Sequence, residues 1–369
     1  MRKLNIAILA GGRSSEHDIS RLSAVSVLAS LDPEKYTAVP VLIERDGDWR
    51  LTSPAKMALS SAPRAGADDD HDEPSDDGRP LSIMRRSEVR PATVTSPSNA
   101  LRGVDVIFPV LHGAFGEDGT IQGLLETAGV PYVGNGVLAS AVGMDKAIFK
   151  AILRDAGIEV APEVVAHRLR DETDAIVARV TSELSFPVFV KPARMGSSIG
   201  ISRVTSEAEL RDALELAFTH DSKVLIEAAV AGVEVECGVL GNEAPIVSVP
   251  GEVVIGNGAE WYDFETKYVE GRMELRVPAG ISEAATTKVR DVALRVFQAV
   301  ECSGLARVDC FVTPDERVVV NELNTMPGCT PTSAYAKLFA ASGHSFNDVV
   351  DRLIQLAIDR HREQTALKH

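Results

Sequence analysis

The chain has 369 residues, of which 45% are hydrophobic and 25% are charged, so its composition is that of a globular protein with room for two or three domains. Its formal net charge of -15 argues against a protein that binds nucleic acid or a membrane surface, since both of these are negatively charged. The four cysteines form no Cys-x-x-Cys pair and are expected to be reduced thiols of a cytoplasmic protein.

The first 140 residues alternate between strand and helix patterns. The opening apolar run over 4–10 is too short for a signal peptide or a membrane span, and it predicts a strand that turns at Gly11-Gly12 into a helix near 20–31. "YTAVPVLIE" and "VDVIFPVLHG" predict further buried strands, and "TIQGLLETAG" predicts a helix closed by Gly129. This alternation is typical of a mostly parallel sheet, although the Gly-x-Gly-x-x-Gly fingerprint is missing.

Residues 57–98 interrupt the alternation. They hold seven acidic residues between Asp68 and Asp77, within "GADDDHDEPSDDGRP". A segment of this composition cannot bury enough apolar surface to offset the entropy lost on ordering, so it predicts a flexible surface insertion. Metal binding by the acidic run is the less favoured alternative.

A second unit is predicted to start at Asp145, which is placed to cap the helix "DKAIFKAILRDAG". "FPVFVKPA" and "GISRV" predict two strands paired around a glycine-rich turn, and "KVLIEAAV" predicts the next strand. Between them, Ser206 and Glu209 have the spacing of a capping box at the start of a helix.

A third unit is predicted from about Gly232. "VEVECGVLG" and "APIVSVPGEVV" indicate antiparallel strands, and a polar loop over 255–271 follows them. Apolar residues at 289, 292, 296 and 300 indicate an amphipathic helix. "LARVDCFV" and "RVVVNELN" then predict a hairpin joined by "TPDE".

This last hairpin carries polar side chains where its strands should be buried. Glu322 and Asn324 are two residues apart and so share one strand face, as do Arg307 and Asp309. If the register places Asp309 opposite Glu322, then Arg307 lies opposite Asn324. Oxygen ligands without a soft partner suit Mg²⁺ or Mn²⁺, and an arginine beside them suits an oxyanion or a phosphoryl group. The simpler alternative is a salt-bridged hairpin without a ligand.

Two turns carry candidate anion-binding groups. "VKPARMGSSIG" places Lys191 at a strand end before a turn rich in glycine and serine, although it is not a Walker A loop and such turns often bind nothing. "AGGRSSEHDIS" places Glu16 at a helix start, either as an ordinary first-turn acid or as a counter-ion for a substrate ammonium. His17 is expected at the surface, and His112 follows a strand end, where open α/β sheets bind ligands.

The order of these elements resembles that of an ATP-grasp enzyme, and more narrowly that of the D-alanine–D-alanine ligase family. The resemblance runs from residue 7 to about 333, outside the acidic insertion, and its matching stretches are "AGGRSSEHDIS", "FPVLHGAFGEDGTIQGLLE", "GMDK", "FPVFVKPARMGSSIGIS", "YDFETKY", "GLARVDCF" and "NELNTMPGCTPTS". Each motif alone is modest, whereas seven in order are specific. The fold class expected is α/β, with α+β character in the C-terminal parts.

The resemblance implies the three-domain architecture of ATP-grasp enzymes. These are an N-terminal parallel-sheet substrate domain over 1–140, a central ATP-grasp domain over 141–231, and a C-terminal domain over 232–369 with the metal site and a lid loop. ATP would lie between the central and C-terminal sheets. The implied enzyme phosphorylates one D-alanine with ATP and joins it to a second for peptidoglycan synthesis, and it is a homodimer.

The same resemblance implies roles for individual residues. The expected ligands of two Mg²⁺ or Mn²⁺ ions are Asp309, Glu322 and Asn324. The expected catalytic residues are Glu16, Ser197, Tyr268, Arg307 and Gly328, of which Arg307 and the Gly328 amide would face an oxyanion. His112 and Ser333 would contact substrate. The ATP-binding residues would be Lys146, Lys191, Ser198, Glu227, Val230, Glu234 and Lys267.

Two positions depart from the family pattern. Ala228 follows Glu227 where relatives often have a charged or polar residue, with little effect expected because adenine contacts there are largely through the backbone. Ala334 follows Ser333 where relatives usually have Leu or Met beside the second substrate, which leaves the acceptor open. Tyr268 favours a dipeptide product, because ligases that form D-alanyl-D-lactate tend to have Phe there.

Several alternatives remain at this point. The nearest is a ligase that joins D-alanine to D-lactate or D-serine. Biotin carboxylase or glutathione synthetase would fit the metal hairpin but not Glu16 with "YDFETKY". A non-catalytic nucleotide-binding protein would be expected to have lost a metal ligand or a phosphate lysine, and an NAD-dependent oxidoreductase would be expected to have the glycine fingerprint.

Overall fold

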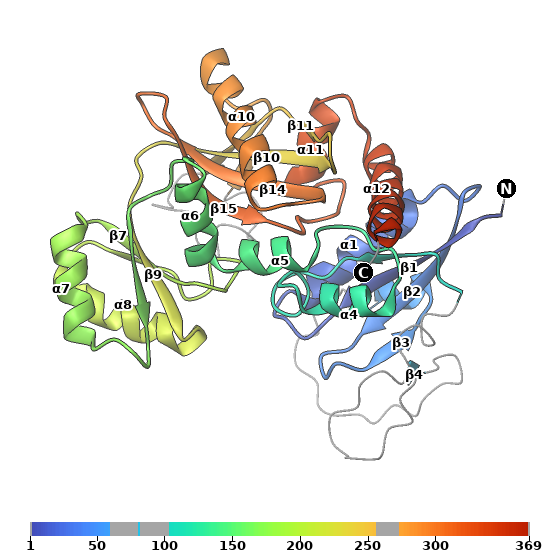
Figure 1. The fold of residues 1–369 in the computed structure, drawn as a ribbon, viewed down its shortest axis with the longest axis horizontal. Coiled ribbons are helices and arrows are strands. Elements are labelled where there is room, and N and C mark those ends of the chain that lie inside the picture. The colour runs from blue at the N-terminus through green and yellow to red at the C-terminus, as the bar shows by residue number, and fades with distance from the viewer. Residues whose placement is uncertain (1, 60–79, 82–102, 256–272, 368–369) are drawn as a thin grey trace.

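The computed structural model describes residues 2–59, 80–81, 103–255 and 273–367. Three sheets follow one another along the chain, and helices α5 and α6 connect the first to the other two (Figure 1). Of the predicted insertion over 57–98 the structure describes only 57–59 and 80–81, and of the predicted loop over 255–271 it describes only Ile255. Within the described residues, no helix combines the length and apolar character that a membrane crossing requires.

The first sheet has five strands in the order β4-β3-β2-β1-β5. The predicted parallel pairing is confirmed for β1 with β2 and with β5, while β3 and β4 extend the sheet in antiparallel fashion. Both faces of β1 are covered, because Ile6 and Ile8 belong to one buried cluster and Ala7 and Leu9 to another. The elements of this region are β1 (Leu4–Gly11), α1 (His17–Ser30), β2 (Tyr36–Ile43), β3 (Trp49–Leu51), α2 (Pro54–Leu59), β4 (Pro80–Leu81), β5 (Val106–Pro109), α4 (Thr120–Ala128), α5 (Val137–Met144) and α6 (Lys146–Asp155).

The second sheet is antiparallel, with the order β6-β9-β7-β8. Apolar residues of α7 and α8 form a buried cluster with the strands, so these two helices cover the sheet (Figure 1). The predicted strand pair around the glycine-serine turn is confirmed as β7 and β8. The elements are β6 (Glu163–His167), α7 (Thr173–Glu183), β7 (Val188–Pro192), β8 (Ser202–Val204), α8 (Glu207–His220) and β9 (Lys223–Ala228).

The third sheet is also antiparallel, with the order β13-β12-β10-β14-β15 and β11 paired to β10. Residues of α10 and α6 share its buried cluster, among them Val289, Phe149 and Leu153. The predicted hairpin is confirmed as β14 and β15. The elements are β10 (Val233–Gly241), β11 (Ile246–Val247), β12 (Gly251–Ile255), β13 (Met273–Arg276), α10 (Glu283–Ala299), β14 (Gly304–Val312), β15 (Val318–Asn324), α11 (Ala334–Ala341) and α12 (Phe346–Ala366).

One buried cluster joins the two ends of the chain. It combines Ile8 and Phe108 of the first sheet with Phe339 of α11 and Leu353 of α12. Figure 1 shows α12 lying against the first sheet, although it follows the third sheet in sequence.

Two local expectations were wrong. The first helix begins at His17, earlier than predicted, and the His17 side chain is buried, with its Nδ1 2.7 Å from the Gly12 carbonyl oxygen. Ser206 occupies the N-cap of α8 but makes no capping bond; its hydroxyl instead donates to the Glu209 carboxylate over 3.1 Å. The N-cap role of Asp145 is confirmed, since its side chain accepts from the Ile148 amide.

Candidate active site

The register of the β14–β15 hairpin brings four polar side chains to one face of the third sheet. Asp309 pairs with Glu322, and Arg307 pairs with Asn324. Arg307 donates to both carboxylate oxygens of Asp309 over 2.7 Å each, and the Asn324 amide donates to the second of these oxygens over 2.9 Å. The conditional register inferred from the sequence is therefore confirmed.

A β-bulge explains how these side chains avoid the core. Asp309 pairs with Glu322 and Cys310 pairs with Val320, so Asn321 is an extra residue in β15. Val318 and Val320 point into the core before the bulge, and Leu323 does so after it. Simple alternation would have placed Glu322 on the face of Val320, and the extra residue reverses this.

Carboxylates crowd this face of the sheet. Glu236 is buried and paired with Asp309 across β10 and β14, and its Oε1 lies 3.3 Å from Arg307 Nη2. Burial raises the pKa of Asp309 to about 7, and burial likewise raises the pKa of Glu234 to about 8. A divalent cation would relieve this excess of negative charge, and the oxygen-only donors fit Mg²⁺ or Mn²⁺. Among the described residues, no group of three or more His, Cys, Asp or Glu side chains is placed to hold a metal ion. The third donor expected here is the amide of Asn324.

Lysines approach the same place from two other elements. Lys146, at the start of α6, donates to the Met195 carbonyl over 2.9 Å and lies 3.4 Å from Glu322 Oε2. Lys191 of β7 lies 3.3 Å from Asn321 Oδ1 and forms an ion pair with Glu227. Burial lowers the pKa of Lys191 to about 8. The two lysines therefore bridge the second and third sheets beside the carboxylates.

The strand β9 and the segment after it hold further residues that were predicted to bind ATP. Glu227 is buried near the end of β9, Val230 is half-buried in the connection, and Glu234 is the second residue of β10. Ser197 and Ser198 in the glycine-serine turn both have positive φ, of 53° and 56°. This left-handed backbone is uncommon for serine and holds the turn in a folded-back shape.

Loops of the first sheet meet the glycine-serine turn. The Ser197 hydroxyl donates to Glu16 Oε1 over 2.7 Å, which joins residues 181 positions apart. His112 is buried, and its Nδ1 lies 3.0 Å from the Met326 carbonyl oxygen, just beyond the hairpin. Burial lowers the pKa of His112, so its neutral form is favoured. Glycine is favoured at 113, because φ is +72° and a Cβ at this position would lie 2.8 Å from Glu16 Oε2.

The Pro-Gly turn after β15 packs against Ser333. A Cβ on Gly328 would lie 2.8 Å from Ser333 Oγ, so only glycine fits without a shift. Ser333 occupies the N-cap position of α11 but makes no side-chain capping bond. Its Oγ instead lies 2.7 Å from Thr330 Oγ1. Gly328 and Ser333 thus lie together at the end of the hairpin. Lys267 and Tyr268, both predicted for the site, lie outside the described residues.

Several residues of the site were not indicated by the sequence patterns. Lys150 forms a buried ion pair with Glu227, and Glu236 contacts Arg307. Asn321 forms the bulge, and Glu117 accepts from the Gly113 amide over 2.8 Å. Lys150 follows Lys146 by one helical turn and Glu236 follows Glu234 by one strand repeat, so these two spacings were available signals.

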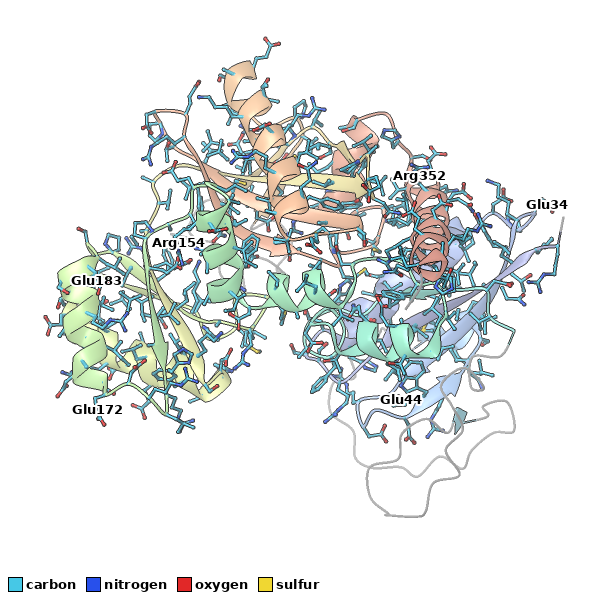
Figure 2. All side chains as sticks on the ribbon, in the orientation of Figure 1. Glu34, Glu44, Arg154, Glu172, Glu183 and Arg352 are labelled. Carbon is cyan, nitrogen blue, oxygen red and sulfur yellow. The ribbon has the colours of Figure 1, made fainter. Side chains whose placement is uncertain are left out.

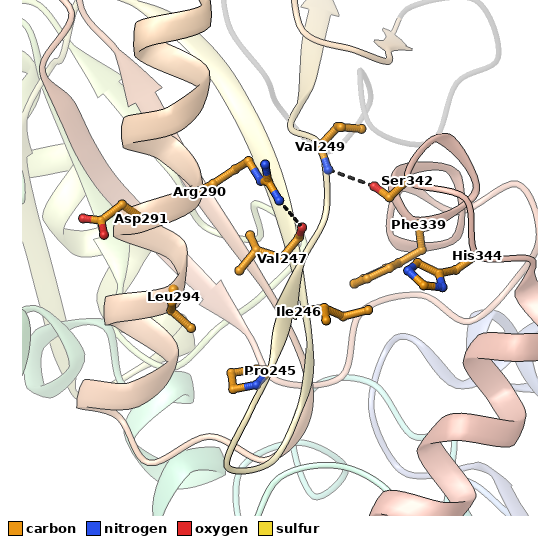
Figure 3. Close-up of a pocket in the computed structure, with 10 residues that line it drawn as sticks. All are labelled: Pro245, Ile246, Val247, Val249, Arg290, Asp291, Leu294, Phe339, Ser342 and His344. Atoms are coloured by element: carbon orange, nitrogen blue, oxygen red, sulfur yellow. Dashed lines mark hydrogen bonds between the residues drawn. The ribbon is translucent and has the colours of Figure 1, made fainter.

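A separate cavity of about 600 Å³ lies between β11, α10 and α11 (Figure 3). Its lining includes Val247, Arg290 and Phe339. Arg290 donates to the Val247 carbonyl over 3.1 Å, and the Ser342 hydroxyl accepts from the Val249 amide over 2.9 Å. None of the candidate site residues lines this cavity, so it does not belong to the site described above.

Comparison with known proteins shows which family this chain resembles. The family profile described as D-ala D-ala ligase N-terminus matches residues 5–135, and the one described as D-ala D-ala ligase C-terminus matches residues 152–355. The D-alanine–D-alanine ligase A of Chromobacterium violaceum is 42% identical over all of this chain and 98% of its own length. The D-alanine–D-alanine ligase of Streptomyces coelicolor is 46% identical over 96% of this chain and 93% of its own length.

Solved structures agree with these matches. The D-alanine-D-alanine ligase from Coxiella burnetii superposes with a TM-score of 0.82 at 35% identity, covering 99% of this chain and 97% of that one. The VanG D-Ala:D-Ser ligase from Enterococcus faecalis has a TM-score of 0.82 at 34% identity, covering 96% of this chain and 100% of that one. The chain therefore belongs to the D-alanine–D-alanine ligase family, with the ATP-grasp fold of that family.

Proposed function

We propose that the protein is an ATP-dependent ligase that joins two D-alanine molecules into D-alanyl-D-alanine for peptidoglycan synthesis, and that it acts in the cytoplasm. The observation that carries this proposal is the hairpin register, which groups Asp309, Glu322, Asn324 and Arg307 on one face. Membership of the family and the names of its full-length relatives support the same reaction.

The chemistry requires activation of a carboxylate. A carboxylate resists attack by an amine because its leaving group would be oxide. A carboxylate oxygen of the first D-alanine therefore attacks the γ-phosphorus of ATP, and ADP departs. The amine of the second D-alanine then attacks the acyl carbon of the D-alanyl phosphate, loses a proton and expels phosphate. Phosphoryl transfer of this kind depends mainly on positioning and charge neutralisation.

The third sheet and the lysines would serve the phosphate end. Asp309, Glu322 and Asn324 would hold two Mg²⁺ or Mn²⁺ ions, which supply charge neutralisation at the phosphates when bound. For this, Arg307 must leave Asp309, to which it is bonded in this structure. Its guanidinium would then face the oxyanion of the tetrahedral intermediate together with the Gly328 amide.

The remaining ATP contacts come from elsewhere. Lys146, Lys191 and Lys267 would contact phosphates, and Ser198 would add a donor from the glycine-serine turn. Glu227, Val230 and Glu234 would bind the adenine and ribose.

The loops of the first sheet would hold the D-alanine substrates. Glu16 would bind the ammonium of the first D-alanine, with Ser197 and Tyr268 as hydrogen-bonded partners. The Glu16–Ser197 bond supports this placement, because it already closes the glycine-serine turn onto the first sheet. His112 and Ser333 would contact substrate, the latter at the carboxylate of the second D-alanine.

D-Serine is the competing acceptor. The small side chain of Ala334 widens the space beside Ser333, and one similar structure is a D-Ala:D-Ser ligase. The relatives named as D-alanine–D-alanine ligases support D-alanine as the main acceptor. We further propose three domains over 1–140, 141–231 and 232–369, each built around one sheet, and a homodimer.

The test is to incubate the protein with ATP, Mg²⁺ and D-alanine and to weigh the products by mass spectrometry, with D-serine or D-lactate added in parallel reactions. We expect D-alanyl-D-alanine as the main product, and no product when EDTA removes the metal. A predominance of D-alanyl-D-serine or D-alanyl-D-lactate at neutral pH would move the function to a different acceptor. Absence of ADP with every mixture would refute the ligase proposal.

A further inference from the structure

Helix α6 carries three cations on one face. Lys146, Lys150 and Arg154 follow at intervals of four residues and therefore lie above one another along the helix. Each faces a different carboxylate: Lys146 faces Glu322 of β15, Lys150 faces Glu227 of β9, and Arg154 faces Glu163 of β6. Arg154 is labelled in Figure 2, beside the strands of the second sheet. The helix thus lies between the second and third sheets, with Lys146 facing the third sheet and Lys150 and Arg154 facing the second.

Lys150 differs from the other two cations in its burial. Its side chain is 1% exposed and that of its partner Glu227 is 4% exposed, whereas the Arg154 side chain is 49% exposed. A buried ammonium is costly unless a carboxylate compensates it. Burial pushes the pKa of Lys150 well below its usual value, the positive charge of Lys191 acts in the same direction, and the negative charge of Glu163 opposes both.

Glu227 is shared between two lysines. Its Oε1 contacts Lys150, and its Oε2 contacts Lys191. Lys191 has a second partner in Asn321 Oδ1 at 3.3 Å, at the edge of the carboxylate face. Under the proposed function, the Lys191 ammonium must contact a phosphate of ATP. It can do so at low cost only if Glu227 keeps another cation when Lys191 turns away.

We infer that Lys150 is a positioning residue for nucleotide binding: it holds the charge of Glu227 in the interior and so releases Lys191 for the phosphates of ATP. Lys150 itself touches neither the nucleotide nor the reacting atoms in this scheme. Without Lys150, Lys191 would be the remaining cation beside the buried Glu227 carboxylate among the contacts described. The ion pair between Glu227 and Lys191 would then be costly to break. This inference rests on the proposed ATP-dependent function.

A double-mutant cycle tests the inference, with the dissociation constant of Mg²⁺·ADP measured by calorimetry. The four proteins are the wild type, Lys150→Met, Glu227→Gln and the double variant. We expect Lys150→Met to weaken ADP binding about tenfold or more in the presence of Glu227, and less than about twofold when residue 227 is Gln, because no buried negative charge then holds Lys191. Arg211→Met, which changes an exposed cation of α8 whose partner Asp174 is also exposed, is the control and should leave ADP affinity unchanged.

Steady-state kinetics separate positioning from general damage. Lys150→Met should raise the KM for ATP in parallel with the ADP dissociation constant, whereas partial misfolding alone would lower kcat and leave KM unchanged. If the single variant fails to fold, the comparison of the double variant with Glu227→Gln decides, since equal ADP affinities support the inference and weaker binding by the double variant overturns it. Equal weakening by Lys150→Met in both backgrounds, or no weakening, also overturns it. Failure of the wild type to bind ADP or to form dipeptide would instead refute the proposed function.

Discussion

At the scale of single residues, the site depends on charges that are out of their usual surroundings. Asn321 turns Glu322 out of the core, and Asp309 is held by Arg307 where a cation is proposed to bind. Lys150 and Glu236 compensate their neighbours from buried positions. Each of these residues acts through a named partner, so substitutions can be interpreted pair by pair.

Asp309→Asn tests the proposed cation site. The substitution keeps the shape of the side chain but removes the negative charge, so the affinity for Mn²⁺ in the presence of ADP should fall about tenfold or more. Titration of Mn²⁺ followed by electron paramagnetic resonance measures this affinity directly. Asp315→Asn, in the exposed turn of the same hairpin, is the control and should bind Mn²⁺ as the wild type does. An unchanged Mn²⁺ affinity in Asp309→Asn would exclude Asp309 as a ligand.

Glu117 predicts a pH dependence of stability. Burial raises the pKa of Glu117 to about 8, and the negative charge of Glu16 adds to the rise. The folded state therefore binds more protons than the unfolded state between an unfolded pKa of 4.5 and a folded pKa of about 8, so the favourable contribution present at low pH is lost as pH rises through this window.

Glu117→Gln removes this titration. The Gln side chain can still accept the Gly113 amide bond. Relative to the wild type, the variant should gain on the order of 1–2 kcal/mol between pH 5 and pH 8, a modest value because the side chain is partly exposed. Urea unfolding at pH 5, 6.5 and 8 measures the difference, and a difference that is constant with pH would contradict the prediction.

At the scale of elements, helix starts were predictable to within a few residues, but their capping bonds only in part, since Asp145 caps α6 as predicted and Ser206 does not cap α8. Ser345 of α12 forms a reciprocal capping box with Asp348, whereas Ser206 of α8 has a similar sequence pattern and makes no capping bond. Local sequence identifies the pattern, and the rotamer of the serine decides whether its oxygen reaches the backbone amide.

Ser345→Ala should therefore destabilise the protein more than Ser206→Ala does. The lost bond at Ser345 is to the Asp348 amide over 3.2 Å, and loss of such a cap costs about 1 kcal/mol. Ser206→Ala removes only an exposed bond to Glu209 and should cost less than about 0.5 kcal/mol. Urea titrations measure the two free energies of unfolding. Equal decreases in the two variants would show that the Ser345 cap stabilises the protein no more than the Ser206 hydroxyl does.

The same contrast explains how far sequence could predict the site. The shared faces of Arg307 with Asp309 and of Glu322 with Asn324 follow from a strand repeat of two, so the hairpin could be predicted once its register was assumed. The bulge at Asn321 could not, because it depends on how the strand fits its partner and the core. The ion pair of Lys150 with Glu227 joins α6 to a strand more than seventy residues later, and local sequence patterns carry no signal for a contact between such distant positions. His17 was expected at the surface, and its contact with the Gly12 carbonyl likewise became visible only in the folded structure.

At the scale of the whole molecule, Arg360 of α12 fastens the end of the described chain to distant segments. It donates to the carbonyls of Gly134 and Tyr132 and to the Ser303 hydroxyl, and its guanidinium carbon lies 4.4 Å from the centre of the Tyr132 ring. These partners come from the connection between α4 and α5 and from the connection between α10 and β14. One side chain thus links three parts of the chain.

Arg360→Met should lower the free energy of unfolding by about 2–3 kcal/mol, because it leaves buried carbonyl groups without a donor. Arg362→Met is the matched control two residues later, since that side chain is 76% exposed and its distance to Asp359 is 3.8 Å. The control should change stability by less than about 0.5 kcal/mol. Denaturant unfolding of both variants measures the difference, and similar stabilities of the two would show that the Arg360 contacts are dispensable.

The buried cluster that joins the first sheet to α11 and α12 also bears on biosynthesis. Ile8 and Phe108 are made early, while Phe339 and Leu353, which cover them, leave the ribosome only after the second and third sheets. Helix α1 contributes Ala24 and Val27 to this cluster, so the first sheet emerges with one apolar face only partly covered until α11 and α12 have been translated. Nascent chains arrested before Phe346 should consequently engage chaperones through this face, and the native first sheet should form after translation of α12.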